Sequence, residues 1–229
     1  MIHEDFKNNA NLIEADFSGL NFYIRYNNAQ TFVGSTNLKK VIYGEYGGFG
    51  AGTFSGCSSL ETVVFPEDIT KYRLSDQGEF VNFSAAFQNC ISLKEVVLPK
   101  QWNYLNTNIN NCFRGCTSLE YLDVPENFDA AFANGFSYFV AGCSNLKTLI
   151  LRPISYTVFY QNCCNGATAL ESLIIFNPTP ANVQGGGLPT NGTCVIYVPD
   201  ESVNAYKIAS GWLAHADRIK GISEYPGTL

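Results

Sequence analysis

The chain has 229 residues, of which 46% are hydrophobic and 15% charged, and its formal net charge is −6. This composition indicates a folded chain, since disordered chains are poorer in apolar residues and richer in charge. The excess of acidic over basic residues disfavours a nucleic-acid-binding role, which relies on a positively charged surface. No run approaches the roughly 18–20 apolar residues of a membrane span, and the start, MIHEDFKNNANL, lacks the pattern of a secretory signal.

The first 31 residues resemble the rest of the chain only weakly. The stretch NLIEADF near residue 12 is at most a degenerate copy of the motif that follows. We therefore predict that residues 1–31 form an N-terminal cap or a degenerate first repeat.

From residue 32 onward, one motif recurs along the chain. FSGCSSLETVVFP (54–66), FQNCISLKEVVLP (87–99) and FRGCTSLEYLDVP (113–125) align without gaps, and VAGCSNLKTLILRP (140–153) follows with one extra residue. Weaker copies occupy residues 32–43 and 164–178. The motif leucines follow one another at steps of 22, 33, 26, 27 and 24 residues: Leu38, Leu60, Leu93, Leu119, Leu146 and Leu170. Leucine-rich repeats have periods of about 20–29 residues, so the pattern predicts a solenoid over residues 32–199.

Each repeat is predicted to supply one short strand of a parallel sheet. Side chains in a strand alternate between its two faces, so Val63 and Phe65 should point inward while Thr62 and Val64 point outward. A proline after the strand removes a hydrogen-bond donor and ends the pairing. The 33-residue step predicts an insertion near residues 75–82.

The eight cysteines have three open interpretations: disulfides, a metal site or buried thiols. Four of them, Cys57, Cys90, Cys116 and Cys143, share one repeat position, so they should stack as buried small side chains. No Cys-x-x-Cys pair or nearby histidine favours zinc, and we expect no metal site. Cys194 is predicted to be the most accessible thiol.

The outward strand positions supply the candidate binding residues. A mostly apolar column runs through Ile42, Val64, Val97, Asp123, Ile150 and Ile174, and its neighbour through Lys40, Thr62, Glu95, Tyr121, Thr148 and Ser172. An exposed apolar stripe often marks a partner surface, although strand propensity or self-association also explains it. We predict ligand contacts at the centre of these columns: Thr62, Val64, Glu95, Val97, Tyr121, Asp123, Thr148 and Ile150.

The motif F-x-G-C-x-x-L-x-x-φ-x-φ-P (φ, apolar) resembles that of the BspA-like, or Treponema pallidum-type, bacterial leucine-rich repeat proteins over about residues 32–222. The resemblance implies a right-handed α/β solenoid with its parallel sheet on the concave face and short return segments on the convex side. It also implies that residues 200–229 form a C-terminal helical cap and tail. Asp200 should cap the helix, while Val203, Tyr206 and Trp212 should cover the open end.

Three functions remain open at this stage. The leading hypothesis is a non-catalytic module that binds a protein or glycan ligand on the concave face, with adhesion at the bacterial cell surface implied by the resemblance. A structural array that dimerises through the apolar stripe is the alternative, and a hydrolase is less favoured because no acid, base and nucleophile converge. No cofactor and no catalytic residue is expected. Because no signal peptide is evident, a cytoplasmic location also stays open.

Overall fold

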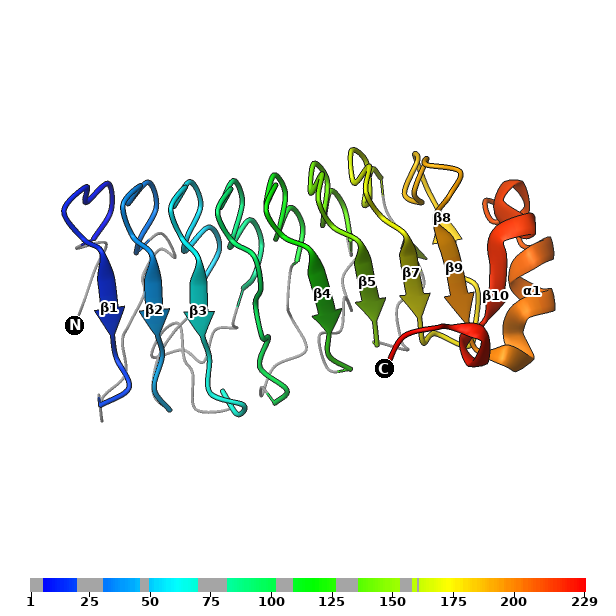
Figure 1. Cartoon of the computed structure of the whole chain (residues 1–229), viewed down its shortest axis with the longest axis horizontal. Helices are drawn as coiled ribbons and strands as arrows, with labels where there is room; N and C mark the ends of the chain where they lie inside the picture. Colours follow the sequence, from blue (N-terminus) through cyan, green and yellow to red (C-terminus); the bar gives the residue numbers. More distant parts are fainter. Residues whose placement is uncertain are drawn as a thin grey trace.

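The chain forms an elongated array of stacked coils, with the N-terminus at one end of the array and the C-terminal helix at the other (Figure 1). The computed structural model describes residues 6–19, 31–45, 50–69, 82–101, 109–126, 136–152, 158–159 and 161–229. Apart from Asn82, the insertion predicted near residues 75–82 lies outside these ranges.

Successive coils contribute short parallel strands that pair edge to edge. One sheet has the order β1, β2, β3, and a second has the order β4, β5, β7, β9, β10. Their bounds are Glu14–Asp16 (β1), Lys40–Ile42 (β2), Thr62–Val64 (β3), Tyr121–Val124 (β4), Thr148–Leu151 (β5), Ser172–Ile175 (β7), Val195–Val198 (β9) and Ile219–Gly221 (β10). Residues one repeat apart are lateral neighbours, as in the pair Val41 and Val63. The predicted leucine-rich-repeat solenoid is confirmed.

The inward side chains form continuous rows along the array. All six motif leucines, from Leu38 to Leu170, are fully buried, as the strand alternation predicts. The motif phenylalanines form a second row, in which ring centroids of successive coils lie 5.1–5.5 Å apart: Phe32, Phe54, Phe87 and Phe113. In the next coil Val140 holds the motif position, and the ring of the preceding residue, Phe139, continues the row at 5.4 Å from Phe113. One interior therefore runs through the whole array, and burial of its apolar surface is the main stabilising contribution.

The glycine that precedes the motif cysteine has a structural reason. Gly142 and Gly166 both have a φ of 78°, in the left-handed region that side chains disfavour. A Cβ on Gly166 would also lie 3.3 Å from the Cα of Gly142 in the neighbouring coil. Asparagine, which tolerates this conformation, takes the same position at Asn89, where φ is 60°. The tight turn and the close stacking of coils thus select Gly or Asn here.

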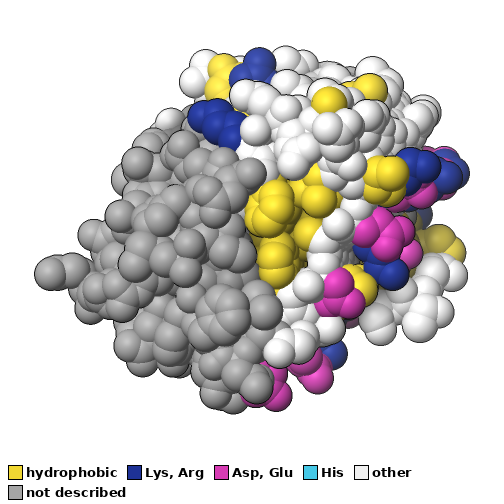
Figure 2. All heavy atoms as spheres, turned by 90° about the vertical axis from the view of Figure 1, so that its left-hand side faces the viewer, with side chains coloured by type: hydrophobic (Ala, Val, Ile, Leu, Met, Phe, Trp, Pro, Cys, Tyr) yellow, Lys and Arg dark blue, Asp and Glu magenta, His cyan; other side chains and the backbone are white. Residues whose placement is uncertain are grey.

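The return side of the array carries a smaller pairing, between β6 (Val158–Phe159) and β8 (Asn182–Val183). At the end that holds β1, hydrophobic side chains gather in the centre of the surface (Figure 2). Three partly buried residues of the first coil, Phe6, Leu12 and Ala15, pack against the core. Within the described ranges, no helix has the length and apolar character needed to cross a membrane.

The C-terminal end of the array is covered by helical segments: η1 (Asp200–Ser202), α1 (Val203–Ile208), η2 (Leu213–Arg218) and η3 (Ile222–Glu224). Tyr206 and Trp212 are fully buried, and each donates a hydrogen bond to a backbone carbonyl of the preceding coil, at 2.8 and 2.7 Å. Val203 packs against the same core. The predicted capping by Asp200 is wrong: Ser202 begins α1 without a side-chain cap, and the Asp200 carboxylate accepts hydrogen bonds from Ser223 instead.

Candidate functional site: a pocket where the sheet divides

The parallel ladder is interrupted between the fourth coil and β4. The chain at residues 94–101 pairs backward, with bridges from Val97 to Val64 and from Gln101 to Asp68. β4 pairs forward, with β5. Among the described residues, β4 forms no ladder pair with residues 94–101. A backbone hydrogen bond from Glu120 N to Lys94 O joins the two segments just before β4 begins. The coils remain stacked through their return turns, where Phe87 N donates to Cys112 O, so a seam opens only in the sheet.

A pocket of about 610 Å³ occupies this seam. Val97 and Tyr121 are its exposed apolar members, with 65% and 42% of their surfaces accessible. They lie on opposite sides of the seam, on the side of the sheet whose side chains point away from the core, here called the outer face. A hollow with apolar walls and polar groups at its margin is the usual form of a binding site.

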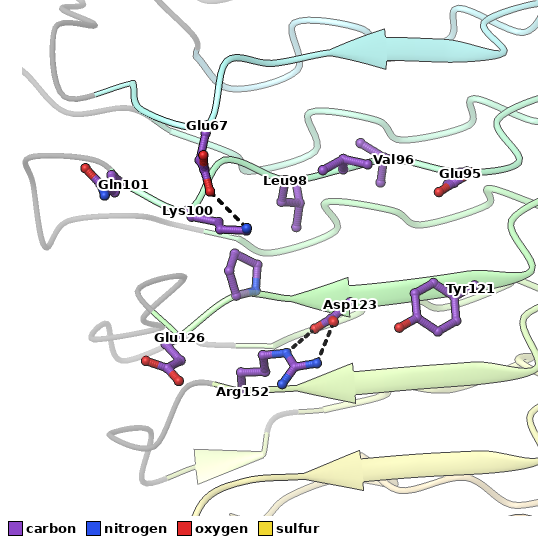
Figure 3. A pocket seen from close by; sticks show the side chains of 12 residues that line it. Glu67, Glu95, Val96, Leu98, Lys100, Gln101, Tyr121, Asp123, Glu126 and Arg152 are labelled. Atoms are coloured by element: carbon purple, nitrogen blue, oxygen red, sulfur yellow. Dashed lines mark hydrogen bonds and ion pairs between the residues drawn. The ribbon is translucent and has the colours of Figure 1, made fainter. Parts of the chain in front are cut away.

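Two ion pairs border the pocket (Figure 3). Arg152 of the coil that contains β5 donates two hydrogen bonds of 2.8 Å to the Asp123 carboxylate of β4. Its guanidinium also lies over the ring of Phe176, 5.1 Å from the centroid. On the other side, Lys100 and Glu67 form an exposed pair at 2.9 Å. The fork-shaped, half-buried Arg152–Asp123 pair has the fixed geometry that the single-contact surface pair lacks.

The charges around the pocket are predominantly negative. Glu95 and Glu126 add two carboxylates to those of Glu67 and Asp123, against the two cations Lys100 and Arg152. The hydrogen bonds from Arg152 to Asp123 raise the pKa of the guanidinium, so Arg152 stays protonated. Burial, with a smaller contribution from Asp123, raises the pKa of the Tyr121 hydroxyl, which is therefore a neutral hydrogen-bond donor at ordinary pH.

Half of the sequence-predicted binding residues meet at this pocket: Glu95, Val97, Tyr121 and Asp123. Thr62 and Val64 lie on β3 and are exposed, next to the pocket along the outer face. Thr148 lies on β5 and is half-buried. The expected exposure of Ile150 is wrong: it is fully buried, although it lies on the outer face. Ile174, in the same column, is also fully buried.

Sequence reasoning missed eight lining residues of the pocket, and four of them are charged: Glu67, Lys100, Glu126 and Arg152. All four stand next to a proline that follows a strand, at positions 66, 99, 125 and 153. The prolines that the structure describes, Pro66, Pro99 and Pro125, mark the same edge of the sheet, so a charged residue beside such a proline is a signal that the sequence contains. What the repeat pattern does not contain is the seam that turns this edge into a pocket.

The cysteines form a second ordered column, inside the core. All eight are buried and unbridged, as predicted for the four column members, whereas the expected accessibility of Cys194 is wrong. Each column thiol donates to a phenylalanine carbonyl of the preceding coil, at 3.0–3.1 Å: Cys57 to Phe32, Cys90 to Phe54, Cys116 to Phe87 and Cys143 to Phe113. The part of the chain that the structure describes holds no cluster of three His, Cys, Asp or Glu side chains suited to a metal.

The buried thiols, both inside and outside the column, predict a loss of stability at alkaline pH. Burial raises the pKa of Cys57, Cys143 and Cys194 to about 12. Below about pH 8.5 these thiols are protonated in both states, and their contribution to stability is fully present. Above it the unfolded state releases protons that the folded state keeps. The free energy of unfolding should therefore fall by about 1.4 kcal/mol per pH unit for each such thiol, until the folded-state pKa is reached.

Urea denaturation at about pH 8, 9 and 10 measures this fall, and Cys116→Ala provides the comparison. Burial also raises the pKa of Cys116 well above its ordinary value, and Ala167 fills the same repeat position naturally. The variant should show a shallower fall than the parent chain. An identical fall in both would mean that the column thiols do not control the alkaline transition.

The fold and its repeat unit define a class: a parallel-stranded solenoid built on leucine-rich repeats. The family model for the BspA type leucine rich repeat region matches the chain in six copies, over residues 3–76 and 83–183. The chain belongs to this family. It is therefore a repeat scaffold, a class that typically mediates protein interactions.

Two solved structures are similar to this chain at 18% sequence identity. A leucine-rich repeat protein from Bacteroides ovatus aligns with 82% of this chain and 48% of its own, with a TM-score of 0.47. This chain thus spans about half of that protein. The leucine-rich repeat protein of T. pallidum aligns with 95% of this chain and 86% of its own, with a TM-score of 0.48. A comparison with curated proteins finds no match.

Proposed function

We propose that this chain is a non-catalytic binding module that holds a segment of a protein ligand on the outer face of its sheet, centred on the pocket at the seam. The observation that carries the proposal is the pairing of Val97 and Tyr121, two exposed apolar side chains on opposite sides of an acidic hollow. Aromatic residues dominate the energetics of many protein interfaces, and fixed charge pairs at the margin supply orientation.

The choice of a protein ligand over a glycan rests on the character of the pocket. Its exposed side chains, Val97 and Tyr121, offer branched apolar and aromatic surface. The Asp123 and Arg152 side chains form hydrogen bonds with each other rather than presenting free polar groups. Burial of an apolar side chain on Val97 would remove surface from water on both partners, which favours association.

Dimerisation through the apolar stripe, the alternative function, is less well supported. Ile150 and Ile174 are already covered within one chain. Val64 and Val97 are left as the exposed apolar members of the stripe. That remaining surface is short for a stable interface between two copies. Light scattering should accordingly report a monomer, and a stable dimer that Val97→Asp disrupts would favour the alternative.

Panning of a random peptide library tests the proposed pocket. Peptides selected on the parent chain should bind a Val97→Asp, Tyr121→Ala double variant at least about tenfold more weakly, because truncation of interface anchors commonly costs more than 1 kcal/mol each. Ile91→Asp is the matched control: Ile91 is 47% exposed, but it lies in a turn and not on the sheet. Equal losses in both variants, or no dependence on the pocket, would contradict the proposal.

The setting that we propose is the bacterial cell surface, supported by the adhesion roles that the family resemblance implies. Labelling of intact cells with a membrane-impermeant amine reagent provides the test, with Lys100 as an exposed target. Labelling that requires cell lysis would place the chain elsewhere.

A further inference from the structure

The outer face is open at one end and covered at the other. Val64 and Val97 are 41% and 65% exposed, whereas Ile150, Ile174 and Tyr197, which continue the same column, are at most 5% exposed. The repeat does not cause this difference, since all five occupy the same outward position. Side chains from outside this column must therefore cover the last three residues.

Part of the cover is the chain's own segment after β10. Ile222 and Tyr225 pack against the cluster that the three buried residues form, together with Phe176 and Val195 of the repeats, and the Tyr225 ring meets the Tyr197 ring edge-on, with centroids 5.1 Å apart. In Figure 1 this segment, drawn in red, leaves β10, crosses β9 and β7 and ends near β5. The outer face therefore already holds one short helical turn, η3, anchored by a branched apolar side chain and by a tyrosine three residues later on the same side of the turn.

The segment is attached at its beginning and loose beyond Tyr225. Ser223 donates to the Asp200 carboxylate, and Tyr225 N donates to Ile222 O. Residues 226–229 are exposed and, within the described ranges, make no hydrogen bond. Such a segment can leave the surface one anchor at a time.

The cap does not depend on this segment. Tyr206 and Trp212 anchor it to carbonyls of Asn177 and Ala181, and Arg218 donates to three further carbonyls, of Pro189, Asn191 and Cys194. None of these contacts involves residues 222–229. Displacement of the segment would uncover the outer face while leaving the end of the core closed.

The covered region borders the pocket. β5 pairs directly with β4, so Ile150 is the lateral neighbour of Asp123. Tyr225 is also close enough to Tyr121 to contribute to the raised pKa of its hydroxyl. With the segment displaced, the outer face would offer one continuous apolar path from Val97 past the pocket to Tyr197.

We propose that this face binds a helical turn of a partner protein bearing a branched apolar residue followed, three positions later, by an aromatic one, and that Ile222 and Tyr225 are an internal competitor for that position. The inference builds on the proposed function, because it extends the same outer face and names the chemistry of its ligand. The competitor is tethered, so its effective concentration is in the range of mM and it weakens every ligand that must displace it.

A fluorescent peptide of residues 222–229 is the probe, because it requires no knowledge of the partner. It is titrated with the full chain, with a chain ending at Gly221, and with a matched control ending at Pro226, which retains both anchors. The peptide should bind the chain ending at Gly221 at least about tenfold more tightly than either of the others, as the internal competitor is then absent. A peptide carrying Tyr225→Ser should lose this binding.

Panning on the chain ending at Gly221 addresses the partner's chemistry. Enriched peptides should carry the branched apolar and aromatic pair at this spacing, and the 222–229 peptide should displace them. Enrichment of unrelated sequences, or peptides that the probe does not displace, would contradict the assigned ligand class.

Two other outcomes would overturn the proposal. One is failure of the probe to bind the chain ending at Gly221 while that chain still unfolds cooperatively. The other is loss of cooperative unfolding in that chain, which would make the segment an integral part of the fold. Neither outcome bears on the Val97 and Tyr121 variants, so the proposed function stands or falls separately.

Discussion

Replacement of Phe113 by alanine is expected to lower the free energy of unfolding by about 3–5 kcal/mol. The Phe113 ring is fully buried between two others: it stacks on Phe87 with an interplanar angle of 2° and meets Phe139 edge-on at 87°. Truncation would leave a cavity in a row that neighbouring coils cannot close without changing their spacing. Both interfaces of that coil would lose contacts, and coil-to-coil interfaces are what stabilise a stacked array.

Equilibrium denaturation in urea measures this loss, and Leu213→Ala is its control. Leu213 is 64% exposed, so its truncation should change stability by no more than about 0.5 kcal/mol. Similar denaturation midpoints for Phe113→Ala and the parent chain would show that the aromatic row does not hold the coils together.

Aspartate at position 150 should be much more destabilising than aspartate at position 97. The two sites occupy the same outward column, but Ile150 is fully buried in a cluster against which Ile222 and Tyr225 pack, whereas Val97 is 65% exposed. An uncompensated buried charge commonly costs about 3–5 kcal/mol. Asp123 is the lateral neighbour of position 150, so the new carboxylate would face a like charge as well.

Thermal or urea unfolding of Ile150→Asp and Val97→Asp side by side decides this point. Val97→Asp should remain within about 0.5 kcal/mol of the parent chain, because its carboxylate stays hydrated. If the two variants were equally stable, the covering segment would contribute nothing to the folded state.

The sequence predicts the interior of this protein well because one steric rule repeats. A leucine, an alternating strand and a proline recur at nearly constant spacing, so a row such as Leu60, Leu93 and Leu119 can be placed from spacing alone. Each of these is fully buried in the structure. The Gly or Asn before each motif cysteine follows from the same regularity, since it reflects a turn that every coil repeats.

The candidate site is predicted only in part, because its features come from breaks in the repeat. Periodicity places Val97 and Ile150 in identical environments, but Phe176, Val195 and the segment after residue 221 cover the cluster that contains Ile150, whereas Val97 stays exposed. Likewise, Asp200 has the residue type of a helix cap, yet a contact with Ser223, distant in sequence, takes its carboxylate. Long-range contacts of this kind leave no local pattern to read.

The seam is the other feature that spacing does not reveal. The backbone N–H groups of Lys100 and Gln101 donate to the carbonyl of Glu67 in the preceding coil. This stretch therefore pairs with that coil and not with β4. Nothing in the motif of residues 87–99 distinguishes it from its neighbours at this level. The pocket therefore depends on a choice of pairing partner, and that choice is made between coils rather than within one.

The unbridged thiol column also determines the chemical surroundings in which this scaffold keeps its shape. Adjacent coils are tied by S–H donors and stacked rings, with no S–S bond among the eight sulfurs. The folded state thus contains no disulfide on which its stability depends. Reductants that open disulfide-stapled modules have nothing to cleave here, and the architecture is equally suited to a glutathione-rich interior and to an aerated exterior.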